Sequence, residues 1–325
     1  MRWFFRSELG AAVLWVTASL ALAAALAPWA YQGGKWLAAM AETRDWPALV
    51  ESLAGSCRRA KLDRYFDRCL LASALVLLPL LMRRIRRIRA EDGTDDAFHL
   101  RRIPWREASA QLATGLVWSA GWLWALSLAL VWAGALEWRS SMPDLGRIFS
   151  KAVVPAIGAA FVEEWLFRGL LLGLWLRLVR PAAAFLGSAL MFSLLHFLDP
   201  PPGTVFANEA DPLAGFQLLG AMLGHLGDPR FFITDFATLV VVGLILAWSR
   251  WRTGALWMAV GLHAGWIFGF KLCGLLCEAV PGHPLRLWWV GDTLRSGILP
   301  MLVLALTALV CVPWLRRFRD PRRAA

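Results

Sequence analysis

The chain alternates long apolar runs with short polar segments, and basic residues gather where several of the runs end. A helix needs about 20 mostly apolar residues to cross a bilayer, so these runs predict membrane-spanning helices. We therefore expect an all-α, polytopic membrane protein with about eight spans. The expected spans cover residues 9–29, 69–82, 108–136, 152–176, 182–198, 236–248, 255–276 and 298–315.

Three further segments have sequence patterns that predict features other than a membrane span. Residues 32–66 are mixed in polarity and predict a connecting segment, whereas residues 213–226 are suited to a helix on the membrane surface. Residues 25–27 resemble a signal-peptidase site, but the apolar run around them is longer than a usual signal core. We therefore expect the first span to be retained.

The composition argues against a water-soluble core. The chain is 58% hydrophobic and 18% charged, whereas soluble domains are about a quarter charged. Its net charge of +11 comes from basic residues that gather at the ends of the runs. That pattern suits membrane topology and anionic lipid, and we expect no nucleic acid partner. The cysteine count of 5 is odd and predicts no disulfide framework.

The basic clusters predict an orientation. If the arginines of residues 83–89 are cytoplasmic, alternation of the spans places those of residues 177–180, 250–252 and 316–323 on the same side. Both termini are then cytoplasmic, and the basic cytoplasmic loops face anionic lipid. The Trp-rich and Arg-rich ends of the spans are compatible with a bacterial cytoplasmic membrane.

Ionisable side chains interrupt the run at residues 152–176. Each such charge costs roughly 2.5–3.5 kcal/mol on an insertion scale, so Glu163, Glu164 and Arg168 need compensation. Glu164 and Arg168 are four positions apart, share a helix face and can pair. Glu163 points about 100° away from Glu164 and needs a partner from another helix. A carboxylate without a nearby cation is suited to act as a general base.

Histidines on two neighbouring spans are the candidate partners. His196 lies near the outer end of the fifth span, and His263 lies within the seventh. Each histidine alone is more typical of a packed core residue. Histidine is rare inside membranes, however, so two of them beside a Glu-Glu-Arg helix indicate a site.

Motifs on three separate spans occur in a fixed order: Glu163-Glu164-x-x-x-Arg168, Phe192-x-x-x-His196 and His263. This arrangement resembles the CPBP (CAAX protease and bacteriocin-processing) group of intramembrane proteases, which includes the CAAX prenyl endopeptidases. The resemblance covers roughly residues 150–275. It implies a bundle of about eight helices around a polar cavity, and a membrane-anchored protein or peptide as substrate.

The resemblance also implies roles for single residues. Glu163 would be the general base that activates a water molecule together with His196, and His263 would stabilise the oxyanion. Supporting roles, structural or substrate-orienting, would fall to Glu164, Arg168 and Phe192.

One position departs from the family pattern. The third motif usually ends in Asn or another polar residue four positions after its histidine, where this chain has Ile267. Isoleucine cannot donate a hydrogen bond, and loss of an oxyanion donor costs about 2.7–4 kcal/mol. We expect lower or specialised activity, or a catalytically silent relative.

The resemblance leaves the metal open. We expect an enzyme without a metal cofactor, since Glu164 and Arg168 then have roles without an ion. Zinc is the alternative, because two histidines and a glutamate could supply three ligands. The His-Glu-x-x-His spacing of many zinc proteases does not occur.

The chain is expected to form one membrane domain. Residues 1–107 would hold the N-terminal spans and a basic cytoplasmic loop, residues 150–275 the catalytic core, and residues 298–325 the last span and a basic tail. Two other functions stay open: a silent scaffold that binds membrane peptides, and a proton-coupled transporter. A transporter predicts an inverted repeat, and none is evident.

Depth along the helices predicts an irregularity. At about 1.5 Å per residue, Glu163 lies roughly 18 Å from Lys151, whereas His196 lies about 5 Å from Asp199, with both outer ends on one side. Straight helices would not bring these two side chains together. We therefore predict that the fourth helix starts deeper or is bent at Pro155, or that the fifth helix is strongly displaced.

Overall fold

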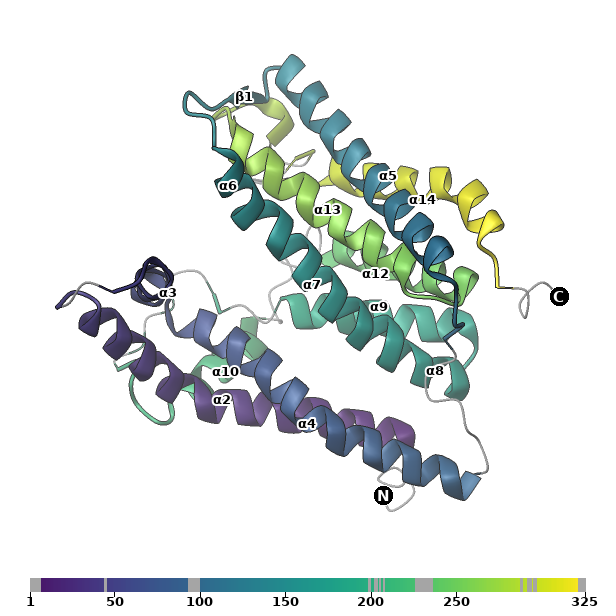
Figure 1. Cartoon of the computed structure of the whole chain (residues 1–325), viewed down its shortest axis with the longest axis horizontal. Coiled ribbons are helices and arrows are strands. Elements are labelled where there is room, and N and C mark those ends of the chain that lie inside the picture. The colour runs from purple at the N-terminus through teal and green to yellow at the C-terminus, as the bar shows by residue number, and fades with distance from the viewer. Residues whose placement is uncertain are drawn as a thin grey trace. The chain divides into compact units, whose positions relative to one another are not determined.

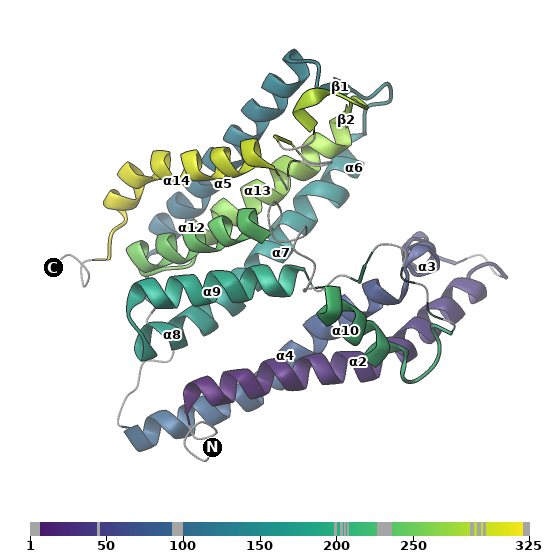
Figure 2. The same cartoon turned by 180° about the vertical axis from the view of Figure 1, so that it is seen from behind.

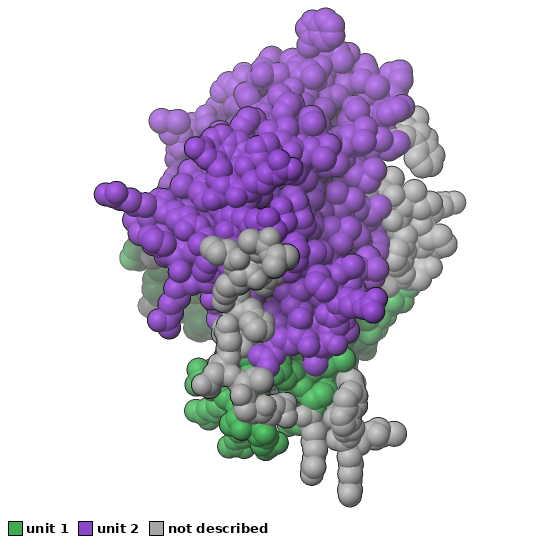
Figure 3. All heavy atoms as spheres, turned by 90° about the vertical axis from the view of Figure 1, so that its right-hand side faces the viewer, with its two compact units in different colours: residues 1–97, 196–228 green, residues 98–195, 229–325 purple. Residues whose placement is uncertain are grey.

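The computed structural model describes residues 7–43, 46–92, 100–197, 200–201, 204, 206, 208–225, 236–286, 289–290, 294 and 297–320 (Figure 1). The chain divides into two compact units (Figure 3). Unit 1 holds residues 1–97 and 196–228, and unit 2 holds residues 98–195 and 229–325. Among the described elements, unit 1 contains α2 (Glu8–Met40), α3 (Ala48–Arg59), α4 (Leu62–Asp92) and α10 (Ala214–His225).

Unit 2 is also built almost entirely of helices, and its small sheet has two strands. In chain order it contains α5 (Trp105–Trp132), β1 (Leu136–Trp138), α6 (Leu145–Ile148), η1 (Phe149–Val153), α7 (Val154–Glu164), η2 (Trp165–Leu171), α8 (Leu172–Leu178), α9 (Pro181–His196), α12 (Ala237–Thr253), α13 (Trp257–Leu276), β2 (Cys277–Ala279), η4 (Pro284–Arg286) and α14 (Ile298–Arg317). The last residue of α9, His196, is counted with unit 1.

The membrane fold class is confirmed. In the described parts of the chain, 6 helices are long and apolar enough to cross a membrane: Glu8–Met40, Leu62–Glu91, Trp105–Trp132, Leu145–Leu178, Trp257–Leu276 and Ile298–Arg317. The other two predicted spans are helical as well. They form α9 with 16 residues and α12 with 17, both shorter than the roughly 20 of an upright span. The number of eight spans therefore stays a prediction.

Unit 1 is organised around the antiparallel pair α2 and α4. Ser7 caps α2 by accepting a hydrogen bond from the Gly10 N–H at 3.0 Å. At the same end of the pair, Arg89 of α4 donates from Nε and Nη2 to the carboxylate of Glu8 at 2.8 and 3.1 Å, and both side chains are buried. α4 begins before the predicted second span and continues through the arginines of residues 83–89.

α2 does not end near Pro28, where the sequence pattern predicted the end of the first span. It continues to Met40. Proline has no N–H, so the carbonyl of Ala24, four residues earlier, loses its usual helical partner. Gly215 of α10 packs so closely on this carbonyl that a Cβ at position 215 would lie 1.9 Å from the Ala24 oxygen. A neighbouring helix thus covers the exposed carbonyl, as happens for prolines in other membrane helices.

The predicted connecting segment, residues 32–66, contains α3 and the start of α4. Lys35 donates to the carbonyls of Arg58 and Ala60 at 2.8 and 2.9 Å, so its ammonium binds the C-terminal end of α3. The helix predicted at residues 213–226 is present as α10, which packs on α2.

Unit 2 is organised around α5 and α13, which run side by side in the same direction (Figure 1). At one end, the N–H of Arg101 donates to the carbonyl of Gly254 at 2.7 Å, joining the segments that precede the two helices. At the other end, the segments that follow them pair as antiparallel strands β1 and β2. The two helices are therefore tied together at both ends.

Glycines bring the backbones of α5 and α13 into contact between these ties. A Cβ at Gly261 would lie 2.3 Å from the carbonyl oxygen of Leu112, and a Cβ at Gly265 would lie 1.9 Å from Ser119 Oγ. Small residues at this spacing are a common way to pack membrane helices. His263 lies midway between the two glycines, about 200° around α13 from each, and so faces away from α5.

The fourth predicted span is a single irregular rod. Its π-helical segments η1 and η2 flank α7, and no break separates α6 from α8. These π-helical segments are an irregularity that the sequence did not predict, and the expected deeper start, bend at Pro155 or displaced fifth helix stays a prediction. π-helical turns change the direction in which the following side chains point, and they are frequent at functional sites.

In unit 2, each long helix runs opposite to the one before it in the chain, and the contacts of α9, α12 and α14 show this (Figure 2). Ser193 near the end of α9 donates to the carbonyl of Phe236 at 3.0 Å, next to the start of α12. The N–H of Asp320, after α14, donates to the carbonyl of Arg252 at 2.8 Å, near the end of α12. The starts of α5 and α13 and the ends of α12 and α14 therefore share one end of unit 2. Basic residues there include Arg101, Arg250, Arg252, Arg316 and Arg317.

Candidate active site

Two buried side chains of opposite charge lie at the centre of unit 2. Arg168 Nη1 donates to Glu164 Oε1 at 2.9 Å, and both side chains are 0% exposed. Their i, i+4 spacing puts them on one face of the rod even though Glu164 ends α7 and Arg168 lies in η2. This pairing, predicted from the spacing, is confirmed.

Phe192 of α9 covers the pair. The Arg168 guanidinium carbon lies 4.2 Å from the centroid of the Phe192 ring, a cation–π contact. The same ring packs edge-on against Phe167 at 5.1 Å and against the His263 ring at 5.8 Å. A cation–π contact like that of Arg168 with Phe192 contributes about 2 kcal/mol when desolvated. Phe192 is itself fully buried and shields the charges from lipid and water.

His263 connects α13 to both glutamates. Its Nδ1 lies 2.8 Å from Glu164 Oε1, so this one oxygen is bound by Arg168 and by the ring. Because an ionised carboxylate only accepts hydrogen bonds, Nδ1 carries the hydrogen. That tautomer leaves the other ring nitrogen, Nε2, turned toward Glu163, with 3.8 Å between Nε2 and Glu163 Oε2.

The two adjacent glutamates differ in access. The Glu164 side chain is sealed in the protein and bound by two donors, whereas the Glu163 side chain is 28% exposed. Glu163 can therefore meet water or a substrate, and Glu164 cannot. At 3.8 Å the approach of His263 Nε2 to Glu163 Oε2 is longer than a hydrogen bond, so the pairing of Glu163 with a histidine on another helix stays a prediction.

The other two predicted positions lie on the same helices. His196 is the last residue of α9, one turn after Phe192, and it is half-buried. Its pairing with Glu163 stays a prediction, because His196 is counted with unit 1. Ile267 is half-buried on α13, one turn after His263, and places a hydrocarbon where the family pattern has a polar group.

Sequence reasoning missed the bond between His263 and Glu164. It treated Glu164 and Arg168 as a self-contained pair and considered His263 only as a candidate partner of Glu163 and as the residue that stabilises the oxyanion. A usable signal was present in Gly261-x-His263-x-Gly265. Two glycines that pack on one neighbouring helix turn the residue between them toward the opposite side.

A metal ion in a protein is usually held by three or more side chains with nitrogen, oxygen or sulfur ligands. Among the residues that the structure describes, no group of three His, Cys, Asp or Glu side chains is arranged to hold one. At the site, Glu164 Oε1 and His263 Nδ1 bind each other, and Glu163 Oε2 lies 3.8 Å from His263 Nε2.

Comparison with known proteins finds a family model to which part of the chain is similar. Residues 146–269 match the family described as Type II CAAX prenyl endopeptidase Rce1-like. This match confirms the resemblance inferred from the motifs, over the segment that contains α7, α9, α12 and most of α13. It supports a CAAX-type intramembrane protease and a membrane-anchored protein or peptide as substrate. Neither the curated proteins nor the solved structures contain a match to the chain.

Proposed function

We propose that the chain, with residues 146–269 matching that family, is an intramembrane endopeptidase that uses Glu163 as general base and needs no metal ion. The observation that carries the proposal is the contrast between the two glutamates. Glu164 is 0% exposed and held by Arg168 and His263, whereas Glu163 is 28% exposed beside the free edge of the same ring. In this proposal Glu164 holds Arg168 and His263 in place, and Glu163 is the residue that reacts with water.

In the proposed reaction, Glu163 takes a proton from water while the water oxygen attacks the carbonyl carbon of the scissile peptide bond. The tetrahedral intermediate then collapses, the C–N bond breaks, and Glu163 returns the proton to the leaving amine. A positioned general base of this kind contributes about 10²–10⁴-fold to the rate. We assign His196 to hold the same water, because α9 carries it one turn after Phe192, on the face that Phe192 presents to His263.

His263 is proposed to stabilise the oxyanion from Nε2. Because Nδ1–H is directed to Glu164, donation from Nε2 requires the doubly protonated ring. An imidazolium held between two glutamates would supply both a hydrogen bond and a positive charge to the intermediate. Ile267 adds no donor one turn away, so we expect a slow enzyme that depends on His263.

The position of Arg168 supports the metal-free form of the proposal. A cation already binds Glu164 at 2.9 Å, and a divalent ion nearby would meet its positive charge. The competing zinc form would use Glu163, His196 and His263 as ligands around an open position. Chelation separates the two forms.

The proposal includes an orientation. The basic end of unit 2 is assigned to the cytoplasm of a bacterial cell, with both termini on that side. His263 lies six residues into α13 from this end, or about 9 Å. Glu163 lies 15 residues before the end of α8, or about 22 Å from the same end, so the scissile bond would lie within the membrane, within reach of a membrane-anchored substrate.

The test is proteolysis by the full chain reconstituted in lipid vesicles. The substrates are single-span peptides, with and without a prenylated C-terminal cysteine, and mass spectrometry identifies the cut. We expect Glu163→Gln to lower the rate at least 100-fold and His263→Ala or His196→Ala to lower it strongly. The matched control is Glu278→Gln, an exposed glutamate outside the site, which should leave the rate unchanged.

Three outcomes would count against parts of the proposal. Full activity of Glu163→Gln would remove the general-base assignment. Inactivation by a chelator with recovery on added zinc would establish the metal form. Binding of the peptides without any cleavage, unchanged by these substitutions, would favour a peptide-binding scaffold, the function that Ile267 supports.

A further inference from the structure

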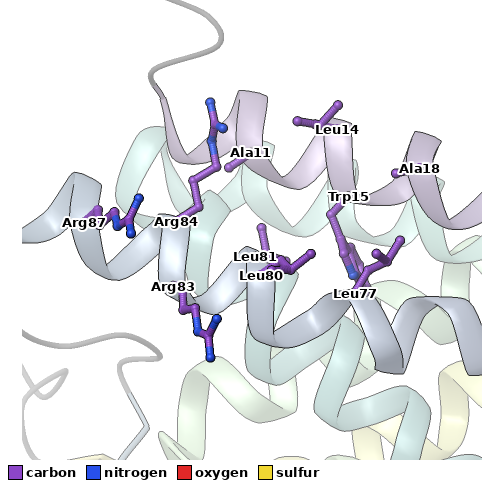
Figure 4. Close-up of a pocket in the computed structure, with 10 residues that line it drawn as sticks. All are labelled: Ala11, Leu14, Trp15, Ala18, Leu77, Leu80, Leu81, Arg83, Arg84 and Arg87. Carbon is purple, nitrogen blue, oxygen red and sulfur yellow. The ribbon is translucent and has the colours of Figure 1, made fainter.

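Unit 1 contains a groove between the first turns of α2 and the C-terminal half of α4 (Figure 4). Its volume is about 390 Å³, within the roughly 300–1,000 Å³ of small-molecule sites. One part of the lining is apolar and the other part is basic. Figure 4 shows Leu14, Trp15 and Leu80 toward one end and Arg83, Arg84 and Arg87 toward the other. We call it the α2–α4 groove.

The length of α4 explains why the two kinds of lining meet. From Leu62 to Met82 the helix rises about 30 Å, which matches the hydrocarbon thickness of a bilayer. When this part spans the membrane, Arg83 and the next arginines stand at the level of the lipid headgroups. The apolar part of the groove then lies at the level of the acyl chains.

Two arginines of the groove, Arg83 and Arg87, keep their positive charge available. Glu8, in the first turn of α2, forms a buried ion pair with Arg89. The side chains of Arg83 and Arg87 are exposed, and neither forms an ion pair with a described residue. A phosphate group at this level would meet two guanidinium groups, which bind phosphate in a fork geometry.

We propose that the α2–α4 groove binds one anionic phospholipid, with an acyl chain along Leu14 and Leu80 and the phosphate on Arg83 and Arg87. The charge selects an anionic over a zwitterionic lipid, and the apolar part selects a whole lipid over a free phosphate. The site lies in unit 1 and is independent of the proposed proteolysis. It would fix α2 and α4 at one surface of the membrane.

The test is native mass spectrometry of the detergent-purified full chain, titrated with palmitoyl-oleoyl phosphatidylglycerol. We expect one tightly bound lipid per chain, and weaker binding of phosphatidylcholine with the same acyl chains. The double substitution Arg83→Gln/Arg87→Gln should weaken phosphatidylglycerol binding about 30-fold. The control Arg316→Gln/Arg317→Gln removes the same charge at the end of α14 and should leave binding unchanged.

A second pair of variants tests the apolar part without changing charge. Ala18 lines the groove, so Ala18→Trp should fill it and weaken binding, whereas Ala21→Trp on the exposed face of α2 should not. Circular dichroism checks that each variant is folded. The proposal is overturned if the two double arginine substitutions weaken lipid binding equally, or if the two lipids bind equally well. Either result would mean that lipid is held by general attraction to the protein surface and not by the groove. Competition by inorganic phosphate alone, or a dimer in place of bound lipid, would also overturn it.

Discussion

Glu164→Gln tests how much the buried ion pair contributes to stability. The substitution keeps the shape of the side chain but leaves the Arg168 charge uncompensated at 0% exposure. Removal of one partner from a buried pair typically costs about 3–5 kcal/mol, most of which is the penalty of the remaining buried charge. We therefore expect the free energy of unfolding to fall by about this amount.

The chain supplies a matched control for this measurement. Arg139 and Glu278 form the same kind of pair at 3.0 Å, but their side chains are 43% and 46% exposed. Exposed pairs contribute about 0–1 kcal/mol, so Glu278→Gln should have little effect. Both variants are measured by reversible unfolding in mixed micelles with increasing SDS, followed by circular dichroism.

The double variant Glu164→Gln/Arg168→Met extends the test. It removes the buried charge together with its partner, so it should be more stable than Glu164→Gln alone. The reasoning is refuted if Glu164→Gln and Glu278→Gln destabilise equally, or if loss of Arg168 makes the Glu164→Gln protein still less stable.

Three further predictions follow from the geometry of α13 and its neighbours. Gly261→Ala should lower the free energy of unfolding by about 1–3 kcal/mol, because the added Cβ would lie 2.3 Å from the backbone of α5. Gly274→Ala on the same helix has open space around its Cβ and should leave stability unchanged or raise it. Equal melting temperatures of the two variants would contradict this prediction. Ile267→Asn should raise the rate of peptide cleavage tenfold or more by adding an oxyanion donor, and an unchanged or lower rate in the vesicle assay would count against that role. Burial raises the pKa of the Cys277 thiol to about 11, so the reactive thiolate is about 100-fold rarer below pH 9 than at an ordinary thiol, and maleimide labelling should speed up as pH rises toward 11. Labelling of the folded protein at pH 7 as fast as a free thiol would contradict the last prediction.

The helices and one contact of the site could be predicted from sequence because both depend on local periodicity. Apolar runs marked every predicted span, and the i, i+4 spacing identified the pair of Glu164 and Arg168. The same reasoning placed the end of the first span near Pro28, where local sequence predicts a break. The helix continues because Gly215, nearly 190 residues later, covers the carbonyl that proline leaves without a partner.

The rest of the site depends on contacts between distant segments. The pattern Gly261-x-His263-x-Gly265 indicates only that His263 faces away from the helix on which the glycines pack. That His263 binds Glu164 depends on how this glycine contact positions α13 against α5. The π-helical segments around α7 are likewise unmarked, because a π-helical turn replaces ordinary helical bonds without needing a glycine or proline at each turn. The position of Phe192 over Arg168 follows from the packing of α9 and not from its sequence.

The contact between α5 and α13 also determines when the proposed active site can be completed during synthesis. About 125 residues separate the end of α5 from the start of α13. At about 5–20 residues per second, α5 waits roughly 6–25 s after its own synthesis for the helix that packs on its glycine face. Until then His263 has not been made, and Glu164 lacks one of its two donors. A growing chain therefore inserts Glu163 into the membrane well before the rest of the proposed site has been synthesised. Other membrane proteins nearby can meet a complete site only when the chain is nearly finished.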